Sequence, residues 1–498
     1  MTAVSAEADV LVVGGGPAGA VAASLLAARG HSVFLASQPR LREHELANSL
    51  PPSTRKLLAG VQILEIVDRV GLKTTGNTVW WGSGDRRVEP FDSTGRECGY
   101  QVLRSALDPE LLAHARTTGV QVYDDAVVRR VTFKNQEARL VASSSARGAL
   151  TATGRMALDC SGRAGVVARR GFRRQRPDVR MQALLGAWEQ PAWNLADATH
   201  TIVETYEAGW AWSIPVSPTV RHVGTMIDGA VSGVLRGSTL AATYRSELAK
   251  SRQLDAHVAR ARLQHVWACD ASVYSSAEYG NESCLLVGDA GSTIDPLSSY
   301  GVKKALASAW LASVVAHTCL VHPERQALAL RFFADWEENV YATYRERSRV
   351  YAVEAYSRHP SRFWETRASQ EPATTGQQPT AEPVLRLPAV VAAYEAMRNT
   401  GDVTVRRNPE VPFVQAPLVR DGEIVAEDAI HLLGAAPVRY VHGVDLLTIC
   451  SLASERASVP DLFEAVRARV SHVSLPQFLG ALAVLVASRA LATDPQLV

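Results

Sequence analysis

Three glycines near the N-terminus have the spacing of a phosphate-binding turn. They stand between an apolar stretch at residues 9–13 and an alanine-rich stretch at residues 20–29, and a second apolar stretch follows at residues 32–36. In G-x-G-x-x-G spacing the first glycine permits a tight turn, the second lets a pyrophosphate approach, and the third lets helix and strand pack closely. The sequence therefore predicts a strand–turn–helix–strand unit that binds a dinucleotide. The residues expected to contact it are Gly14, Gly16, Pro17, Ala18 and Gly19.

The stretch 288–306 offers a second set of polar groups at the end of a predicted strand. The apolar residues 284–287 lead into Gly288 and Asp289, and a helix is expected to begin near Gly301. A short acidic side chain at a strand end can accept hydrogen bonds from sugar hydroxyls. The N-terminus of the following helix presents unpaired N–H groups to electron-rich atoms. This segment is therefore predicted to hold another part of the ligand.

Two further motifs lie between these segments. One is Leu158–Arg163 (LDCSGR), which closes a predicted strand, and the other is Tyr100–Arg104 (YQVLR), with Leu107 and Asp108 after it. Together with the glycine-rich turn and the Gly-Asp pair, they occur in an order that resembles the FAD-dependent monooxygenases and halogenases. The resemblance covers residues 8–367 and implies FAD as the cofactor.

That resemblance assigns a part of FAD to each motif. It places Asp289 on the ribityl chain and the segment 296–302 beside the isoalloxazine ring. It brings Arg104 to the flavin phosphates or the ring edge, and the D-x-S-G-R segment to the pyrophosphate. The other residues that it assigns to the flavin site are Asp159, Gly162, Pro296, Gly301 and Val302, with Ser299 as a candidate catalytic residue.

One position departs from the pattern of this family. The acidic residue that usually ends the second strand and holds the adenosine ribose is replaced by Ser37. Serine can still hydrogen-bond a hydroxyl group, but it brings no charge, so about 1 kcal/mol of cofactor affinity is expected to be missing. FAD is therefore predicted to bind loosely enough to exchange.

Two tryptophans bear on the reaction that the flavin would serve. The stretch Gly209–Pro215 (GWAWSIP) resembles the W-x-W-x-I-P signature of flavin-dependent halogenases. Trp210 and Trp212 stand at alternate positions of a predicted strand, so their rings should share one face. The resemblance implies that they separate the flavin from the substrate. The alternative is a pair of core tryptophans in a sheet.

A halogenase also needs a lysine that intercepts hypohalous acid. In the family's spacing its place falls here at Thr74 or Thr75, and Lys73 stands one or two residues away. On a strand, an offset of one residue turns a side chain to the opposite face. The glutamate of the preceding E-S-x-x-P motif is also replaced, by Asn48. Lys73 therefore stays a candidate catalytic residue beside the alternative of an ordinary solvated lysine.

These departures favour oxygenation over halogenation. We predict an FAD-dependent monooxygenase in which a flavin C4a-hydroperoxide, formed with O2, hydroxylates an electron-rich aromatic ring. The ring would belong to an indole, a phenol or a residue on a peptide or carrier protein, in natural-product biosynthesis or peptide maturation. NAD(P)H directly, or a partner flavin reductase, would reduce the FAD.

Other functions stay open beside this one. They are an FADH2-dependent halogenase of an aromatic substrate, a flavin reductase that saturates its substrate, and a flavoprotein that acts by binding a partner. The candidates for acid–base work are Lys73, Lys303, Lys304 and Glu204.

The pattern of apolar residues predicts an α/β fold with a Rossmann-type FAD-binding domain. Residues 1–170 and 270–367 should form that domain, with helix almost continuous after residue 301. Residues 171–269 are rich in strand patterns and predict an inserted antiparallel sheet on the substrate side. The polar, proline-rich residues 368–383 predict a linker.

A small α+β module is predicted at residues 384–498. Asp421-Gly422 should turn a hairpin, and helices are expected at residues 444–454, 459–470 and 474–489. This order loosely resembles a winged helix and the leader-peptide recognition domains of peptide-maturation enzymes. The last helix is apolar, so we expect it to pack in a core and the module to dock a peptide or protein rather than nucleic acid.

Composition agrees with a cofactor-binding enzyme. The 498 residues are 47% hydrophobic and carry a net charge of +2, which argues against a nucleic-acid-binding role. The six cysteines are scattered without C-x-x-C pairs, so neither a zinc site nor a disulfide framework is expected. The uncharged residues 10–28 fit the dinucleotide turn better than a membrane span or a signal peptide. A cytoplasmic location is the simplest expectation.

Overall fold

The computed structural model divides the chain into two compact units. Unit 1 consists of residues 1–326 and 333–373, and unit 2 of residues 327–332 and 374–498. Most of the predicted linker, residues 371–383, lies outside the described residues. The structure describes residues 4–39, 47–82, 84–92, 97–175, 180–193, 195, 197–229, 238–370, 384–400, 402–432, 437–470 and 473–494.

A parallel sheet is the framework of the predicted dinucleotide site in unit 1. Its central strand β1 (Val4–Val13) pairs with β2 (Val33–Ala36) on one side and β11 (Gly148–Asp159) on the other. β8 (Gln121–Tyr123) and β20 (Cys284–Leu286) extend it, in the order β20-β11-β1-β2-β8. This parallel order, with crossover helices, is that of a Rossmann-type sheet, as predicted. The chain adds an antiparallel meander through β9 (Ala126–Lys134) and β10 (Glu137–Ser144).

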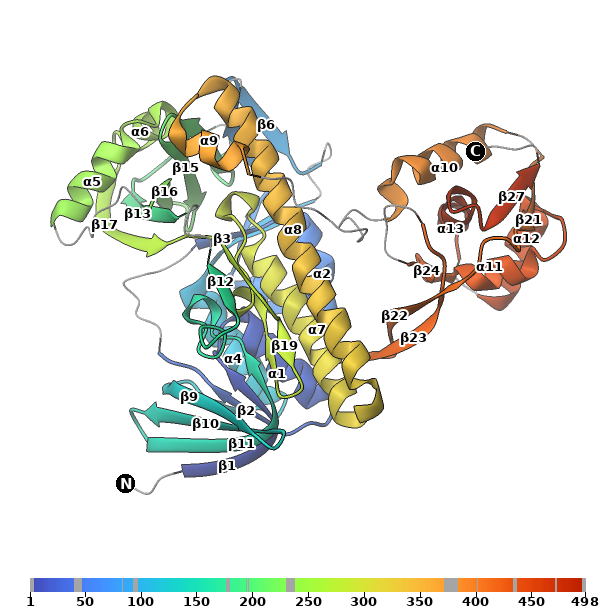
Figure 1. Cartoon of the computed structure of the whole chain (residues 1–498). Coiled ribbons are helices and arrows are strands. Elements are labelled where there is room, and N and C mark those ends of the chain that lie inside the picture. The colour runs from blue at the N-terminus through green and yellow to red at the C-terminus, as the bar shows by residue number, and fades with distance from the viewer. Residues whose placement is uncertain are drawn as a thin grey trace. The chain divides into compact units, whose positions relative to one another are not determined.

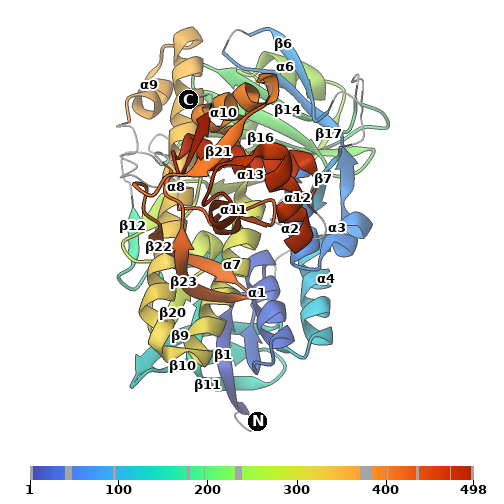
Figure 2. The ribbon, with the colours of Figure 1, turned by 90° about the vertical axis from the view of Figure 1, so that its right-hand side faces the viewer.

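Three helices pack together beside this sheet. α1 (Pro17–Ala28) lies between α4 (Arg104–Thr117) and α7 (Gly301–Val321), as Figures 1 and 2 show. By length and composition alone α7 could cross a membrane, but 72% of its most apolar window is buried in the protein. A helix that is apolar on most sides is expected at the centre of a large domain. α7 is such a core helix.

A second sheet covers the other end of unit 1. Its order is β17-β13-β16-β15-β14-β5-β6, and its pairs are antiparallel except for β14 with β5. β5 and β6 come from before the predicted insertion 171–269, so the sheet extends beyond that insertion. The strands are β5 (Gly76–Trp80), β6 (Arg86–Pro90), β13 (Met181–Glu189), β14 (Thr201–Tyr206), β15 (Gly209–Pro215), β16 (Val220–Asp228) and β17 (Arg262–Asp270).

Each face of this sheet supplies a hydrophobic core. One core packs against α5 (Ser238–Leu248) and α6 (Arg252–Val258). The other packs against the end of α8 (Gln326–Arg358) and against α9 (Arg362–Ala368). The prediction of almost continuous helix from residue 301 to residue 367 is therefore confirmed. A small sheet of order β3-β7-β4, with β3 (Ala47–Leu50), β7 (Gly99–Leu103) and β4 (Leu72–Thr74), completes the strands that matter for the site.

Unit 2 contains the predicted hairpin and helices. The hairpin joins β22 (Val414–Arg420) to β23 (Glu423–Ala429), and both turn residues, Asp421 and Gly422, have positive φ (51° and 84°). Two positive φ angles are typical of the type I′ turn that fits the twist of a hairpin. The predicted helices are α11 (Leu446–Leu452), α12 (Val459–Arg469) and α13 (Leu475–Ala487), and a further helix, α10 (Pro388–Asn399), precedes them.

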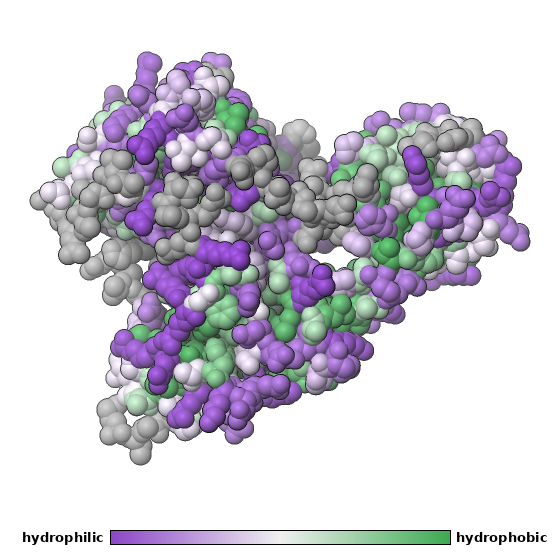
Figure 3. All heavy atoms as spheres, in the orientation of Figure 1, coloured by the Kyte–Doolittle hydropathy of each residue, from purple (hydrophilic) through white to green (hydrophobic). Residues whose placement is uncertain are grey.

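α13 is the packing helix that its apolar sequence predicted. Phe478, Leu482 and Leu485 are fully buried in the core of unit 2. Ser474 and Gln477 begin the helix with a reciprocal capping box, which satisfies backbone N–H groups of the first turn. In Figure 3, hydrophilic side chains cover most of the visible surface and hydrophobic ones show in smaller areas.

Candidate active site

The glycine-rich turn has a backbone that only glycine fits. Gly14 has φ +104°, and a Cβ there would lie 2.5 Å from the carbonyl oxygen of Cys160. A Cβ on Gly19 would lie 1.8 Å from the carbonyl oxygen of Gly14. Both approaches are far closer than a real Cβ permits, so these two positions require glycine. The close packing that the sequence predicted for helix and strand is therefore present.

The start of α1 leaves room and hydrogen-bond donors for a phosphate group. Gly16 is its N-cap, without a side chain to cap the helix, and Pro17 occupies the first turn. The N–H groups of a first turn have no acceptor inside the helix, and the helix dipole favours an anion there. Residues 14–19 therefore fit the pyrophosphate of FAD.

Ser37 lies where the ribose contact was predicted. A Cβ on Gly15 would come within 2.7 Å of the Ser37 side chain, so the end of β2 stands directly beside the turn. The Ser37 Oγ has one long hydrogen bond, 3.4 Å to the carbonyl oxygen of Gln38. The hydroxyl is therefore available to another partner, but no carboxylate is present at this position.

Cys160 and Gly288 bring the separate motifs together. Cys160 follows β11 and borders Gly14, and its N–H donates to the carbonyl oxygen of Val13. A Cβ on Gly288 would lie 3.4 Å from the Cβ of Ala18. Segments that are more than 100 residues apart in the sequence thus meet around the start of α1. This convergence fits one extended dinucleotide.

The carboxylate of Asp159 accepts hydrogen bonds from neighbouring residues, and contact of this segment with the pyrophosphate stays a prediction. The side chain is fully buried and accepts hydrogen bonds from its own chain. The donors are the N–H and Oγ of Ser161 and the N–H groups of Val167 and Ala168, at 2.6–3.1 Å. Asp159 therefore shapes the loop that holds Gly162, which has φ +61°.

Arg104 is held by its own helix. Its guanidinium donates to both carboxylate oxygens of Asp108, at 2.6 and 2.9 Å, one turn along α4. The side chain is largely buried, with 15% of its surface exposed. This pair fixes the direction of Arg104, and contact with the flavin remains a prediction for it.

Asp289 is the acidic residue with an unused carboxylate. It lies in the short turn Gly288–Ala290 after β20, and its side chain forms no hydrogen bond with any of the residues described. Its carbonyl oxygen accepts from the hydroxyl of Tyr274, at 2.6 Å. A partly buried carboxylate with free acceptor capacity fits a ribityl hydroxyl of FAD. These residues therefore fit the cofactor that the sequence implied.

A buried ion pair braces the turn that carries Asp289. Lys304 on α7 donates to the carbonyl oxygens of Gly288 (2.9 Å) and Ser292 (2.7 Å), and its Nζ lies 3.8 Å from Glu337 on α8. Ser308, one turn further along α7, accepts from the Gly288 N–H and donates to Glu337. Burial raises the pKa of the Glu337 carboxyl, while Lys304 lowers it. Lys304, an acid–base candidate from the sequence, is therefore a positioning residue.

The segment predicted beside the isoalloxazine forms a turn and a helix start. Asp295 caps the turn Pro296–Ser298 by accepting from the N–H of Leu297 at 3.0 Å. Ser299 is exposed and has φ +53°, an uncommon value for a serine. Pro296 is also exposed, Gly301 has open space where a Cβ would stand, and Val302 is buried.

Glu204 and Lys303 also have structural partners. Glu204 is buried and accepts from the N–H groups of Gln253 and Leu254 and from the hydroxyl of Ser251, so it caps the start of α6. The Nζ of Lys303 donates to the Ser53 hydroxyl at 2.8 Å. Burial lowers the pKa of Lys303.

Trp210 and Trp212 share one face of β15, as their alternation predicted. Their rings are 4.8 Å apart between centroids. Trp210 is buried, and the ring of Trp212 lies so close to Gly224 that a Cβ there would come within 2.3 Å. The two rings form a continuous aromatic wall.

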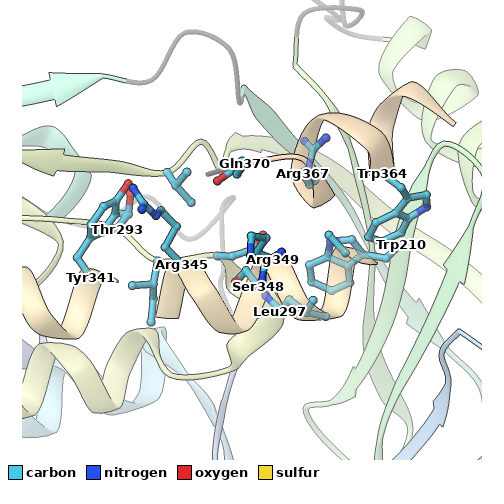
Figure 4. A pocket seen from close by; sticks show the side chains of 14 residues that line it. Trp210, Thr293, Leu297, Tyr341, Arg345, Ser348, Arg349, Trp364, Arg367 and Gln370 are labelled. Carbon is cyan, nitrogen blue, oxygen red and sulfur yellow. Dashed lines mark hydrogen bonds between the residues drawn. The ribbon is translucent and has the colours of Figure 1, made fainter. Parts of the chain in front are cut away.

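Trp210 also lines a pocket of unit 1, with a cavity volume of about 40 Å³ for the centres of water-sized molecules. The walls come from β15, from residues 293–297 and from α8 and α9. In Figure 4, Trp210 and Trp364 lie at one end of the pocket, and Tyr341 and Arg345 lie at the other. The pocket therefore joins the halogenase-like tryptophan motif to the segment predicted beside the flavin.

Lys73 lies outside this pocket. It is exposed on β4, whereas its neighbour Thr74 is fully buried and donates to the carbonyl oxygen of Gly76 at 3.3 Å. Alternation along the strand therefore turns Thr74 inward and Lys73 outward. The structure does not bring Lys73 to Trp210, and the lining of the pocket contains no lysine among the residues described.

Several residues of the pocket could not be predicted from a sequence motif. Tyr341 and Arg345 belong to α8, and Trp364 and Arg367 belong to α9. They carry no motif. The sequence offered one signal. Arg367 stands on the face of its helix that also carries the apolar residues, and an arginine is rarely buried unless it has a partner.

Comparison with known proteins agrees with this geometry. A family model described as "FAD binding domain" matches residues 7–314, which is more than half of the chain. The chain belongs to this family, FAD is its cofactor, and the class is that of FAD-dependent enzymes.

The chain is also similar to individual proteins whose names are more specific than that of the family model. Tryptophan 2-halogenase from Chondromyces crocatus is 28% identical over 337 residues, which are 65% of this chain and 64% of that protein. The match thus spans less than two thirds of that relative. The fold is similar to the flavin-dependent halogenase CmlS, with a TM-score of 0.75, 20% identity and coverage of 98% and 96%. It is also similar to the peptidyl tryptophan dihydroxylase QhpG, with a TM-score of 0.69, 22% identity and coverage of 97% and 99%.

Proposed function

We propose that this protein is an FAD-dependent monooxygenase that hydroxylates an electron-rich aromatic substrate. The observation that carries the proposal is the pair Lys73 and Thr74: the inward position of β4 holds a buried threonine, and the lysine faces outward. A lysine that carries hypohalous acid to a substrate must reach that substrate. Direct transfer of oxygen from the flavin side needs no such amine.

The pocket supplies what a hydroxylation requires of the protein. Trp210, Trp364 and Leu297 offer apolar and aromatic surface against which a substrate ring can lie. Bound FAD, once reduced, supplies the electrons that activate O2. Exclusion of water and orientation of the ring are tasks of the protein, and Trp210 in the pocket wall would contribute to both. NAD(P)H or a partner flavin reductase would deliver the electrons.

The substrate could be a small molecule or an aromatic residue on a peptide or carrier protein. The likeness to QhpG, whose name specifies a peptidyl tryptophan, extends over 97% of this chain and so includes unit 2. This extent supports a docking role for unit 2. Natural-product biosynthesis or peptide maturation is the setting that we propose.

Halogenation of an aromatic substrate is the second candidate. The adjacent rings of Trp210 and Trp212 in a W-x-W-x-I-P motif favour it, and so do the halogenase names of the sequence relatives. In such an enzyme Lys73 would have to turn inward, which requires a local bulge in β4.

The mass of the product and the effect of one substitution distinguish hydroxylation from halogenation. With reduced FAD, O2 and an aromatic substrate, mass spectrometry should show a product heavier by one oxygen, with or without bromide. Lys73→Met should lower the rate by less than about tenfold, or 1.4 kcal/mol, because an exposed lysine has no part in the transfer. A brominated product that disappears in Lys73→Met, while oxygen consumption continues, would establish halogenation instead.

A further inference from the structure

The pocket holds hydrogen-bond donors that have no acceptors. Among the residues described, the hydroxyl of Tyr341, a residue that is 8% exposed, has no partner, and neither do Nε and Nη2 of the buried Arg367. Arg345 is partly exposed, and it forms no hydrogen bond or ion pair with any of the residues described. Buried donors are normally satisfied, so an unused set that lines a cavity indicates a ligand that brings acceptors.

The charges around the pocket also favour a ligand that brings acceptors. Three arginines line it: Arg349 lies 2.7 Å from Glu346, Arg367 is attracted by Asp295 and Asp228, and Arg345 has no carboxylate partner among the residues described. The carboxylate that lines the pocket is Asp295, which already accepts from the N–H of Leu297. Burial raises the pKa of Asp295 and lowers that of Arg367, and the attraction between these two groups opposes both shifts. A neutral ligand would leave the charge of Arg345 without a counter-charge.

The two ends of the pocket differ in chemistry. Figure 4 shows Trp210 and Trp364 at one end, and Arg345 extending toward Tyr341 and Thr293 at the other. An elongated molecule with a ring at one end and an anion at the other would match both ends. A guanidinium with a nearby hydroxyl is a good receptor for a carboxylate.

We propose that the pocket binds an arylalkanoic acid, with its ring against Trp210 and Trp364 and its free carboxylate on Arg345 and Tyr341. The assignment rests on the proposed function for the choice of an aromatic substrate. It selects a free acid over a substrate whose carboxyl group is tied up in a thioester or a peptide bond. Arg367 adds positive potential without touching the carboxylate.

Binding to the FAD-loaded protein tests this assignment without turnover. In calorimetric titration, indole-3-butyrate should bind and its methyl ester should bind about 10- to 100-fold more weakly. Arg345→Met should raise the dissociation constant of the acid by about 10- to 100-fold, and Tyr341→Phe by about 2- to 10-fold. Neither substitution should affect the ester.

These variants should fold, because the groups that they remove have no partners among the residues that the structure describes. Arg362→Met is the matched control: it removes an exposed arginine from α9 and should leave binding unchanged. Equal affinity for acid and ester would overturn the proposal. So would a loss confined to Arg367→Met, which would move the anion to the other end, or a loss of FAD from Arg345→Met, which would assign that guanidinium to the cofactor.

Two further results show whether the anion belongs to a free acid or to a carrier arm, and whether the binding proposal or the proposed function is wrong. Binding of 4′-phosphopantetheine in place of the acid would assign the donors to a carrier arm and would overturn the free-acid proposal. Binding of the acid with the expected variant pattern, but no oxygenated product, would sustain this inference and refute the proposed function.

Discussion

Removal of the Lys304 amine should destabilise unit 1 more than removal of the amine of any nearby lysine does. Lys304 and Glu337 both have no exposed side-chain surface, and the Lys304 Nζ is the donor to two carbonyl oxygens of the turn that carries Asp289. Lys304→Met leaves the Glu337 carboxylate buried without a counter-charge. Removal of one member of a buried ion pair costs about 3–5 kcal/mol of unfolding free energy.

The matched control is the neighbouring residue on α7. Lys303 is half-buried, and its Nζ contacts the Ser53 hydroxyl and lies 4.9 Å from the centre of the Tyr300 ring, so Lys303→Met should cost less than about 1 kcal/mol. Urea denaturation of the FAD-free proteins, followed by tryptophan fluorescence, measures both. The double variant Lys304→Met with Glu337→Met should recover part of the loss, since no unpaired charge remains, and a double-mutant cycle gives the coupling.

The deficit of Lys304→Met should also depend on pH. The pKa of Glu337 is already raised by burial, and loss of Lys304 raises it further. A carboxyl whose pKa is higher in the folded state stabilises the fold below its unfolded pKa near 4.5, and that contribution is lost as the pH rises through the folded pKa. The deficit should therefore be smaller at about pH 5 than at about pH 8. A loss equal to that of Lys303→Met, or one that does not change with pH, would refute the reasoning.

Two predictions concern the cofactor. Gly19→Ala should abolish FAD binding, because its Cβ would lie 1.8 Å from a backbone oxygen that cannot move without opening the turn; retention of FAD, seen as the flavin absorbance of the purified protein, would contradict this. Ser37→Glu should tighten FAD binding by about fivefold, or 1 kcal/mol, because a carboxylate accepts from the ribose hydroxyls more strongly than a hydroxyl does. An unchanged dissociation constant in a fluorescence titration would show that the ribose is held elsewhere.

The sequence by itself determined the cofactor and the fold around it. The glycine-rich turn could be predicted because backbone geometry leaves no choice of residue at Gly14 and Gly19, so the local sequence carries the information. The pairing of Trp210 with Trp212 followed for a similar reason, since alternate residues of a strand share a face. The hairpin at Asp421-Gly422 and the buried helix α13 could also be predicted from the local sequence.

The tertiary structure alone decided which polar residues are free to act. In the sequence, Asp159, Glu204 and Lys304 are candidates for binding or catalysis. In the structure, their side chains form hydrogen bonds with backbone groups of other segments. Conversely, Tyr341 and Arg345 carry no motif and become candidate ligands because residues of β15, α8 and α9 enclose one pocket. Hydrogen-bond satisfaction is a property of the whole assembled neighbourhood. No local pattern records it, because each partner comes from a different part of the chain.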